Sequence, residues 1–578
     1  MPSTVTALLL KLYFCRCSYN ALNGVPMCAN RELLTGKLRG DWQFTGYVVT
    51  DCNAFDAIHT DHHFTPSLEA TINVSYGAGS DLYNCGRLRS KQLEEFMAQS
   101  AANEAMLTKS LGHLFGVQMR LGFFDPPELN PYSKLNIKDD VDTPSARALA
   151  KEAADQSLVL LLNRGGTLPL SSSLKHLALI GPNANATSTM QGNYATTDPP
   201  FLMSPLDGFV KLIGRPVDYV QGCGVAVPPK PAGIAAAVAA ANGAEAVCVV
   251  AGLDGKQEGE GHDRSSLLLP SGQSALIKAV AAAASKPIVV LLMSGSALDV
   301  SSLVSNPQVG ALLWVGYPGQ AGGTAIAEAV MGITAPSGRL PMTWYFSNYT
   351  TQVKKTQMAL RPSAGYPGRT YRFVNEPVLF GFGWGLSYTT FHTTASAPAT
   401  LSFQEARAQL EKTRNAPHLA PTLITPRVSV ENTGTLQCDH IVLLFLSPPG
   451  AGQAGRPLRQ LRQFERIRGP KPGATAEVAL PLTSHDFALA GEDGTLAIIP
   501  GVWKLRVDKS EVTIHVGPPP LADEPRSEWV SRLKTDDSGD AGAHAAPPAF
   551  LRTTEACISI HGCSLRLRTE PFSVGGRL

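Results

Sequence analysis

The sequence predicts an α/β protein that ends in a β-sandwich, and three observations support this fold class. Apolar stretches of strand length alternate with helix-forming stretches over about the first two thirds of the chain. From residue 422 to about 516, short strand-like runs stand between Gly and Pro turns, with no helical stretch between them. With 578 residues, the chain is too long for a single hydrophobic core. We therefore expect units at residues 1–140, 141–391 and 421–517, a linker at 392–420 and a tail at 518–578.

Residues 1–140 show a β-α-β-α-β pattern, which is the repeat of a parallel sheet or barrel. The expected strands span 12–17, 47–49 and 79–82, and the expected helices span 32–38, a stretch from about residue 67, and 91–122. Leu107, Leu111 and Leu114 recur at helical spacing and support the last helix.

Residues 141–391 predict a three-layer α/β sandwich. Thr143 followed by Pro144 is a helix start signal, since threonine caps a helix and proline fits its first turn. Nearly continuous apolar strands indicate a sheet that is covered on both faces. The strands are expected at 158–162, 176–180, 246–250, 287–292 and 312–315, and the helices at 145–156, 232–241, 273–284 and 324–331.

The pattern changes twice after residue 391. Residues 392–420 are polar and contain prolines, which predicts a linker. Residues 421–517 predict a small β-sandwich, with strands at 428–430, 441–446, 478–482 and 512–516. Residues 518–578 are rich in Pro, Asp, Ala and Gly, and we expect a disordered tail.

Composition excludes several classes of partner. The net charge of +2 gives no electrostatic reason to expect nucleic acid or a membrane surface as a partner. The ten cysteines show no zinc-site spacing, and no segment matches a nucleotide-binding fingerprint, so neither a metal nor a cofactor is expected. Five cysteines crowd the first 85 residues and suit disulfides in a secreted protein, and Asn73, Asn185 and Asn348 begin potential glycosylation triplets. Residues 7–10 form an apolar run that is weak as a signal peptide and too short to span a membrane.

Asp51 is the first candidate for chemistry, because it follows the apolar run Tyr47-Val-Val49 where that strand must end. Side chains at the carboxyl ends of parallel strands face a crevice and commonly carry function. The alternative is that Asp51 only caps the next helix.

The second candidate is the loop at 254–264, which holds four carboxylates in ten residues with interleaved glycines. Such a loop is mobile enough to bring an acid to a neighbouring domain, although a solvated acidic loop has the same composition. Asp263 and Arg264 are expected to form a structural ion pair, and His262 suits either the surface or a sugar subsite. A retaining glycosidase requires two carboxyl groups, about 5–5.5 Å apart, one as nucleophile and one as acid/base. Asp51 and an acid of this loop satisfy that requirement in residue type.

Several segments, in order from about residue 13 to 516, resemble glycoside hydrolase family 3. The nucleophile segment is Gly46-Tyr-Val-Val-Thr-Asp-Cys52, and its Asp-Cys form resembles the β-xylosidase/α-L-arabinofuranosidase branch. The matching segments are Cys17-Ser-Tyr-Asn-Ala-Leu-Asn-Gly-Val-Pro-Met-Cys28, Gln118-Met-Arg-Leu-Gly-Phe-Phe-Asp125, Leu168-Pro-Leu170, residues 316–323, Leu340-Pro-Met-Thr-Trp344, Gly368-Arg-Thr-Tyr-Arg-Phe373 and Gly381-Phe-Gly-Trp-Gly-Leu-Ser-Tyr388.

The resemblance implies Asp51 as nucleophile and Glu260 as acid/base, with Glu258 as the second candidate for that role. It also implies substrate-binding roles for Tyr19, Cys52, Glu258 and His262. Family members carry a whole (β/α)₈ barrel of about 250 residues. We therefore expect residues 1–140 to be the C-terminal remnant of a barrel, about its last three strands, followed by the α/β sandwich and a fibronectin-III-like β-sandwich.

The implied activity is retaining exo-hydrolysis that releases xylose, or arabinose, from the non-reducing ends of xylan-type oligosaccharides, outside the cell or in the cell wall. Two alternatives stay open from the sequence. One is a β-glucosidase of the same family, because most residues that would shape the first sugar subsite have no counterpart in this chain. The other is a non-catalytic remnant that binds glycans or protein partners.

Overall fold

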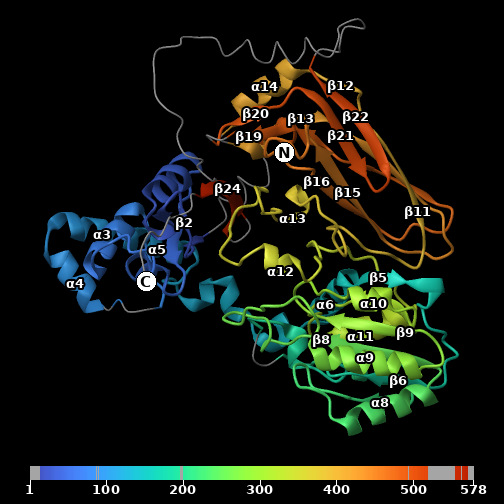
Figure 1. The fold of residues 1–578 in the computed structure, drawn as a ribbon. Helices are drawn as coiled ribbons and strands as arrows, with labels where there is room; N and C mark the ends of the chain where they lie inside the picture. Colours follow the sequence, from blue (N-terminus) through green and yellow to red (C-terminus); the bar gives the residue numbers. More distant parts are fainter. Residues whose placement is uncertain are drawn as a thin grey trace, which may run out of the picture.

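The computed structural model describes residues 13–517, apart from short gaps at 86–87, 89, 196–198, 415 and 492–493, together with 554–560 and 563–569. Three successive units are visible along the chain in Figure 1. The apolar run at 7–10 and most of the expected disordered tail lie outside the described residues.

The first unit is built on a small parallel sheet. β1 (Phe14–Cys17) pairs in parallel with β4 (Tyr47–Thr50), and Val49 of β4 forms an isolated parallel bridge with Leu82 on its other side. The expected parallel order is therefore present in the described residues, with the third strand reduced to one bridge. A short hairpin, β2 (Ala21–Leu22) and β3 (Val25–Pro26), follows β1. The helical segments of this unit are η1 (Met27–Ala29), η2 (Glu32–Asp41), α2 (Ala54–Thr60), α3 (Leu68–Ala78), α4 (Ser90–Ala98) and α5 (Ala101–Arg120).

The single helix expected at 91–122 is wrong, because α4 and α5 are separate helices. The Ser100 hydroxyl accepts a hydrogen bond from the Asn103 amide at 3.2 Å and caps α5. A serine that satisfies one of the unpaired amides of a first turn favours a new helix start over a continuous helix. After short turns η3 (Pro127–Leu129), η4 (Pro131–Lys134) and η5 (Ile137–Val141), the chain enters the second unit.

The second unit is a six-stranded sheet with the strand order β5-β10-β9-β8-β6-β7, in which β5 alone is antiparallel to its neighbour. Helices cover both faces. One buried apolar cluster joins the sheet to α8 and α9, and the other joins it to α6, α7 and α11, which confirms the three-layer sandwich. The elements are β5 (Val159–Asn163), β6 (Leu177–Ile180), β7 (Asp218–Val220), β8 (Ala246–Gly252), β9 (Ile288–Met293), β10 (Val309–Trp314), α6 (Pro144–Ser157), α7 (Pro205–Ile213), α8 (Pro231–Gly243), α9 (Ser271–Ala283), α10 (Ser301–Ser305) and α11 (Gly322–Val330), with turns η6 (Arg164–Gly166) and η7 (Ser188–Gln191).

The expected linker at 392–420 is wrong. β11 (Phe391–Ser396) pairs antiparallel with β14, and β12 (Thr400–Leu401) pairs with β22, so this segment belongs to the β-sandwich. α14 (Phe403–Lys412) buries Ala406 and Leu410 against the same core. The linking segment instead precedes residue 391 and contains the short helices α12 (Tyr349–Gln352) and α13 (Thr370–Phe373).

The β-sandwich is confirmed, with one sheet in the order β11-β14-β17 and the other in the order β12-β22-β21-β15-β16. Trp503 and Phe487 are fully buried between the sheets. The remaining elements are β13 (Thr422–Ile424), β14 (Arg427–Asn432), β15 (His440–Ser447), β16 (Gln460–Ile467), β17 (Thr475–Ala479), β18 (Leu482–Thr483), β19 (Ala488–Ala490), β20 (Leu496–Ile498), β21 (Gly501–Val507) and β22 (Ser510–Val516), with turns η8 (Pro417–Leu419) and η9 (Ser484–Phe487).

Part of the expected disordered tail is ordered as a hairpin. β23 (Thr554–Ile560) pairs antiparallel with β24 (Cys563–Thr569). A disordered tail is therefore the wrong expectation for these two segments, because seven pairs of residues face each other in regular register. Residues 518–553 and 570–578 lie outside the described part of the chain.

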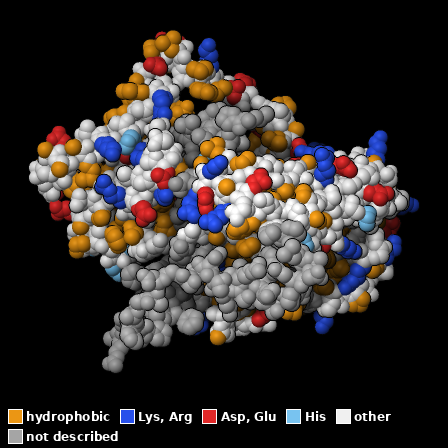
Figure 2. All heavy atoms as spheres, turned by 90° about the horizontal axis from the view of Figure 1, so that it is seen from above, with side chains coloured by type: hydrophobic (Ala, Val, Ile, Leu, Met, Phe, Trp, Pro, Cys, Tyr) orange, Lys and Arg blue, Asp and Glu red, His pale blue; other side chains and the backbone are white. Residues whose placement is uncertain are grey.

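Two surface properties bear on partners. Figure 2 shows Lys and Arg side chains interspersed with Asp and Glu on the face it presents, as the near-neutral composition suggests. Among the described helices, none combines the length and the apolar character that a bilayer span requires.

Candidate active site

Asp51 lies directly after β4, at the carboxyl end of the small parallel sheet. Its amide donates to the carbonyl of Cys17, the last residue of β1, at 3.0 Å. The Asp51 Oδ1 atom accepts a hydrogen bond from the Cys52 amide at 2.7 Å. Its Oδ2 atom lies 3.1 Å from the Arg16 guanidinium, and the Asp51 side chain is 20% exposed. Both carboxylate oxygens are thus oriented by neighbours, while the side chain stays accessible.

Two disulfides bracket Asp51. Cys52 is bonded to Cys85, and Cys17 is bonded to Cys28. The first bridge ties the residue after Asp51 to the loop that follows the third strand position, and the second ties the end of β1 to η1. The crowded cysteines were expected to form disulfides, and one of these bonds contains the predicted site residue Cys52. Cys52 therefore has no free thiol with which to contact a substrate. Cys15, on the same face of β1 as Cys17, is buried in the apolar core of this unit.

Tyr19 lies near Asp51 because its side chain contacts the backbone of Cys52, the residue that follows Asp51. The Tyr19 hydroxyl donates to the Cys52 carbonyl, and a ring nitrogen of His62 lies 2.6 Å from the Tyr19 carbonyl oxygen. The pKa of Tyr19 is raised by burial, and further by the negative charges of Asp51 and Glu260, while Arg16 lowers it. Tyr19 is therefore within electrostatic reach of a carboxylate from each of two units.

Glu260 stands at the tip of a tight turn in the loop after β8. Gly259 and His262 pair through their backbones at 3.1 and 3.3 Å, which leaves Glu260 and Gly261 at the turn. Gly261 has a φ of +75°, a conformation that side-chain-bearing residues rarely adopt. The Glu260 carboxylate hydrogen-bonds with the Tyr194 hydroxyl and thereby raises the pKa of Tyr194, to which the charge of Asp51 also contributes. The loop thus brings Glu260 of the second unit to the surroundings of Asp51 in the first.

Glu258 has a different environment, although it is only two residues away. Its Oε1 atom accepts from the Gly295 amide at 2.5 Å and from the Tyr317 hydroxyl at 2.7 Å, and its Oε2 atom accepts from the Ser296 hydroxyl. The Arg264 guanidinium lies 3.5 Å from Oε2, and the Glu258 side chain is only 13% exposed. Burial and Glu258 together raise the pKa of Tyr317. Glu258 is therefore engaged in holding the loop to the segment after β9.

The expected ion pair between Asp263 and Arg264 is wrong. Arg264 faces Glu258 and also donates to the Ser296 hydroxyl at 2.6 Å, whereas Asp263 pairs with Lys355 at 3.1 Å on the surface. The two adjacent opposite charges therefore find separate partners, one in the segment after β9 and one at the surface. His262 is exposed and contributes its backbone to the turn.

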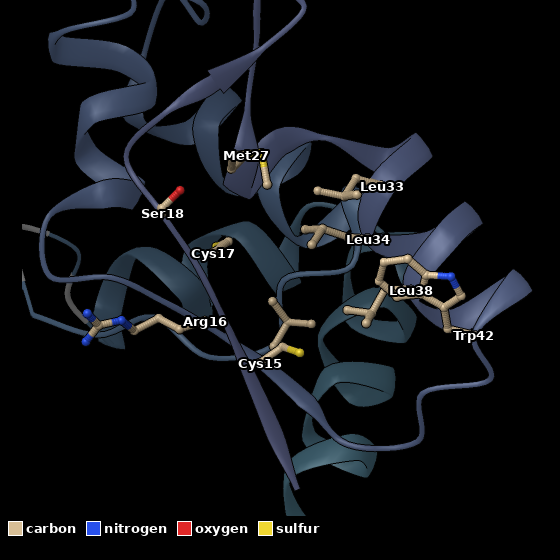
Figure 3. A pocket seen from close by; sticks show the side chains of 10 residues that line it. Cys15, Arg16, Cys17, Ser18, Met27, Leu33, Leu34, Leu38 and Trp42 are labelled. Carbon is tan, nitrogen blue, oxygen red and sulfur yellow. The ribbon is translucent and has the colours of Figure 1, made fainter. Parts of the chain in front are cut away.

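Sequence reasoning missed Arg16, Tyr194 and Tyr317. For Arg16 a signal existed, since side chains alternate along a strand and the buried Cys15 and Cys17 place Arg16 on the opposite face of β1. In Figure 3, the Arg16 side chain extends away from Leu34 and Leu38, with which Arg16 lines a mainly apolar pocket. Tyr194 and Tyr317 gave no signal, because their partners lie far away in sequence.

Comparison with known families covers all three units. The model of the glycosyl hydrolase family 3 N-terminal domain matches residues 11–117, and that of the family 3 C-terminal domain matches 158–388. The model of the fibronectin type III-like domain matches residues 440–511.

Individual proteins are similar over most of the chain. A probable exo-1,4-β-xylosidase of Neosartorya fischeri is 41% identical over 498 residues, which cover 86% of this chain and 63% of that protein. β-D-xylosidase 1 of Arabidopsis thaliana is 40% identical over 520 residues, covering 87% of this chain and 66% of that protein. The chain thus spans slightly less than two thirds of the length of these relatives.

A solved structure of an exo-β-xylosidase of this family, in complex with a xylobiose aziridine activity-based probe, superposes with a TM-score of 0.81. The two chains are 33% identical, and the match covers 89% of this chain and 67% of the other. With matches to both family domains in the correct order, this chain belongs to glycoside hydrolase family 3.

Proposed function

We propose that the protein is a retaining exo-glycoside hydrolase that releases xylose or arabinose from the non-reducing ends of xylan-type oligosaccharides. The observation that carries this proposal is the convergence of Asp51 and Glu260, from different units, on the surroundings of Tyr19 and Tyr194. The relatives named as β-xylosidases support the choice of sugar. An extracellular or cell-wall location, with glycosylated asparagines, completes the proposal and agrees with two disulfides in the first unit.

The proposed reaction has two steps. In the first step, a carboxylate oxygen of Asp51 forms a bond to the anomeric carbon, and the leaving oxygen takes its bonding electron pair together with the proton of Glu260. In the second step, water attacks the same carbon and gives a proton to Glu260, while the bond to Asp51 breaks and restores the carboxylate. The exposure of Glu260 at a turn gives it access to a leaving group and to water, whereas Glu258 is held by four neighbours.

Replacement of Asp51 by Ala tests the nucleophile. We expect the release of nitrophenol from an aryl β-xyloside by the full chain to fall at least about 10⁴-fold, because no covalent intermediate can form. Asp41→Ala is the matched control, since Asp41 lies in the same unit and, within the described part of the chain, pairs with Lys37 alone, at the surface. Assays of the aryl glucoside and the aryl arabinofuranoside beside the aryl xyloside show which sugar the enzyme releases with the highest kcat/KM. Unchanged turnover in the Asp51 variant, or a folded chain that hydrolyses none of these substrates, would contradict the proposal, and the second result would favour a glycan-binding role.

The acid/base assignment has its own test. We expect Glu260→Ala to keep most of its kcat/KM on an aryl xyloside with a strongly acidic phenol and to lose activity on xylobiose, because only the xylobiose leaving group needs the acid in the first step. Its kcat on the aryl xyloside should fall because the second step has lost its base, and azide should restore this kcat because azide needs no general base. Glu258→Ala is the comparison, and it should show no azide rescue, because its loss releases the loop from Gly295, Ser296 and Tyr317. Rescue of the Glu258 variant alone would reverse the two roles.

A further inference from the structure

We propose that Arg16 is a positioning residue that assists the second step of the reaction by stabilising the Asp51 carboxylate as it leaves the anomeric carbon. The inference rests on the proposed function, and it goes beyond it by giving a role to a residue that no part of that mechanism requires.

The contact that carries the proposal is direct. The Arg16 guanidinium lies 3.1 Å from Oδ2 of Asp51. Arg16 is in β1, and Asp51 directly follows β4, which pairs with β1, so no strand lies between them. Arg16 is 44% exposed at its side chain, so it is not buried to fill space. The alternating pattern of β1 places its neighbours Cys15 and Cys17 in the apolar core and Arg16 on the other face (Figure 3).

The charged surroundings of Asp51 give Arg16 a distinct part. Once Glu260 has given its proton to the leaving group, it places a second carboxylate near Asp51, and the hydroxyls of Tyr19 and Tyr194 lie within electrostatic reach of both residues. His62, in the turn that follows α2, contacts the Tyr19 carbonyl. Arg16 brings the opposite charge to Asp51 itself, and a charge-assisted contact of this kind is stronger than a neutral hydrogen bond.

The direction of the effect follows from the charge on Asp51 at each stage. Asp51 is an anion in the free enzyme and a neutral ester in the glycosyl-enzyme, and its charge returns when water displaces it. A guanidinium stabilises the anion more than the ester, so it opposes formation of the intermediate slightly and favours its breakdown. In that breakdown the electron pair of the carbon–oxygen bond returns to Asp51, and the proton of the attacking water goes to Glu260.

The experiment measures the two steps separately on the full chain. A 2-deoxy-2-fluoro-β-xylosyl fluoride forms a long-lived adduct, whose position on Asp51 is verified by peptide mass spectrometry. Excess reagent is then removed, and the return of activity reports the rate of the second step. For Arg16→Met we expect labelling at least as fast as in the unmodified protein, and reactivation slower by about tenfold. With natural substrate, kcat and KM should fall together, because the intermediate accumulates.

Two further variants separate positioning from folding. Arg16→Lys retains a positive charge and should restore a substantial part of the reactivation rate. Arg31→Met removes an arginine of the same unit whose guanidinium donates to the Gly77 carbonyl, and it should leave both rates unchanged. Far-UV circular dichroism and the melting temperature verify that each variant is folded.

Each outcome decides between the two ideas. Reactivation of Arg16→Met at the unmodified rate overturns the proposal for Arg16, and so does an equal slowing of both steps that lysine does not reverse. Absence of an adduct on Asp51 in the unmodified chain overturns the proposed function, and the role of Arg16 falls with it. An adduct on Asp51 together with normal reactivation of the Arg16 variant leaves the proposed function intact and rejects only the further inference.

Discussion

The unit that carries Asp51 and the six-stranded unit that carries Glu260 are stabilised by different means. In the first unit, two paired strands and one bridge form the sheet, and two disulfides and a buried carboxylate hold the connecting segments. In the second, strands β8, β9 and β10 are buried almost completely between two layers of helices. Its cysteines Cys223 and Cys248 are buried free thiols, and burial raises their pKa values to about 11 and about 12, which keeps them protonated and unreactive.

The difference teaches that the first unit depends on a few specific bonds, whereas the second depends on the sum of many apolar contacts. A small core buries too little apolar surface to offset chain entropy by itself, so covalent and ionic contacts carry more weight there. Conditions that act on disulfides or on a single buried charge should therefore affect Asp51 before they affect the six-stranded sheet.

Reduction of the disulfides should produce the largest difference in stability between the two units. Closure of loops with sequence separations of 11 and 33 residues corresponds to roughly 3 and 4 kcal/mol of stability. We expect a phosphine reductant to abolish both the enzymatic activity and the hydrogen-exchange protection of β1 and β4. The strands β8 and β9 should keep their protection. A Cys52→Ser, Cys85→Ser double variant should reproduce the effect without reductant. Equal loss of protection in both units would show that the difference in stabilisation does not exist.

Removal of the buried carboxylate Asp81 should have the next largest effect. Asp81 accepts the Val48 amide at 2.7 Å, contacts a His113 ring nitrogen at 2.8 Å and pairs with Arg39, and its side chain is only 2% exposed. Asp81→Ala leaves the nearly buried Arg39 without this partner, which should cost about 3–5 kcal/mol in the free energy of unfolding. Urea denaturation measures the change. Asp41→Ala, which breaks an exposed pair with Lys37, is the control and should cost no more than about 1 kcal/mol.

The smallest effect on stability should come from lowering the pH, which acts on a buried histidine of the β-sandwich. Burial lowers the pKa of His485, whose ring nitrogen lies 3.0 Å from the Thr413 hydroxyl. The unfolded chain therefore binds a proton more readily than the folded chain as the pH falls below the ordinary histidine value of 6.5. The contribution of His485 to the free energy of unfolding is fully present above pH 6.5. It is lost as the pH falls toward the lowered pKa of His485 in the folded state. Thermal unfolding at pH 7.5 and 5.5 should show a smaller drop in His485→Gln, and an identical drop in both proteins would contradict this assignment.

Much of the fold could be predicted from the sequence because the signals were local. The apolar strands of the six-stranded sheet, the Thr143 cap and the β-sandwich strands each showed their period or start signal within a few residues. The edge strand β7 was missed, since Asp218 and Tyr219 are exposed and carry no apolar run. The segment 392–420 was misread as a linker because β11 buries only Thr393 among its six residues.

The sequence by itself determined the order of three units, the position of Asp51 at a strand end and the presence of a carboxylate-rich loop. Only the tertiary structure decided how the members of that loop differ, with Glu258 engaged by Gly295, Ser296 and Tyr317, and Glu260 hydrogen-bonded to Tyr194, whose hydroxyl is also within electrostatic reach of Asp51. It also decided that Cys52 pairs with Cys85 and that Arg16 faces Asp51. The physical reason is that strand and helix periods are written over a few consecutive residues, whereas charge pairs, disulfides and hydrogen-bond partners are chosen by residues that meet only after the chain has folded.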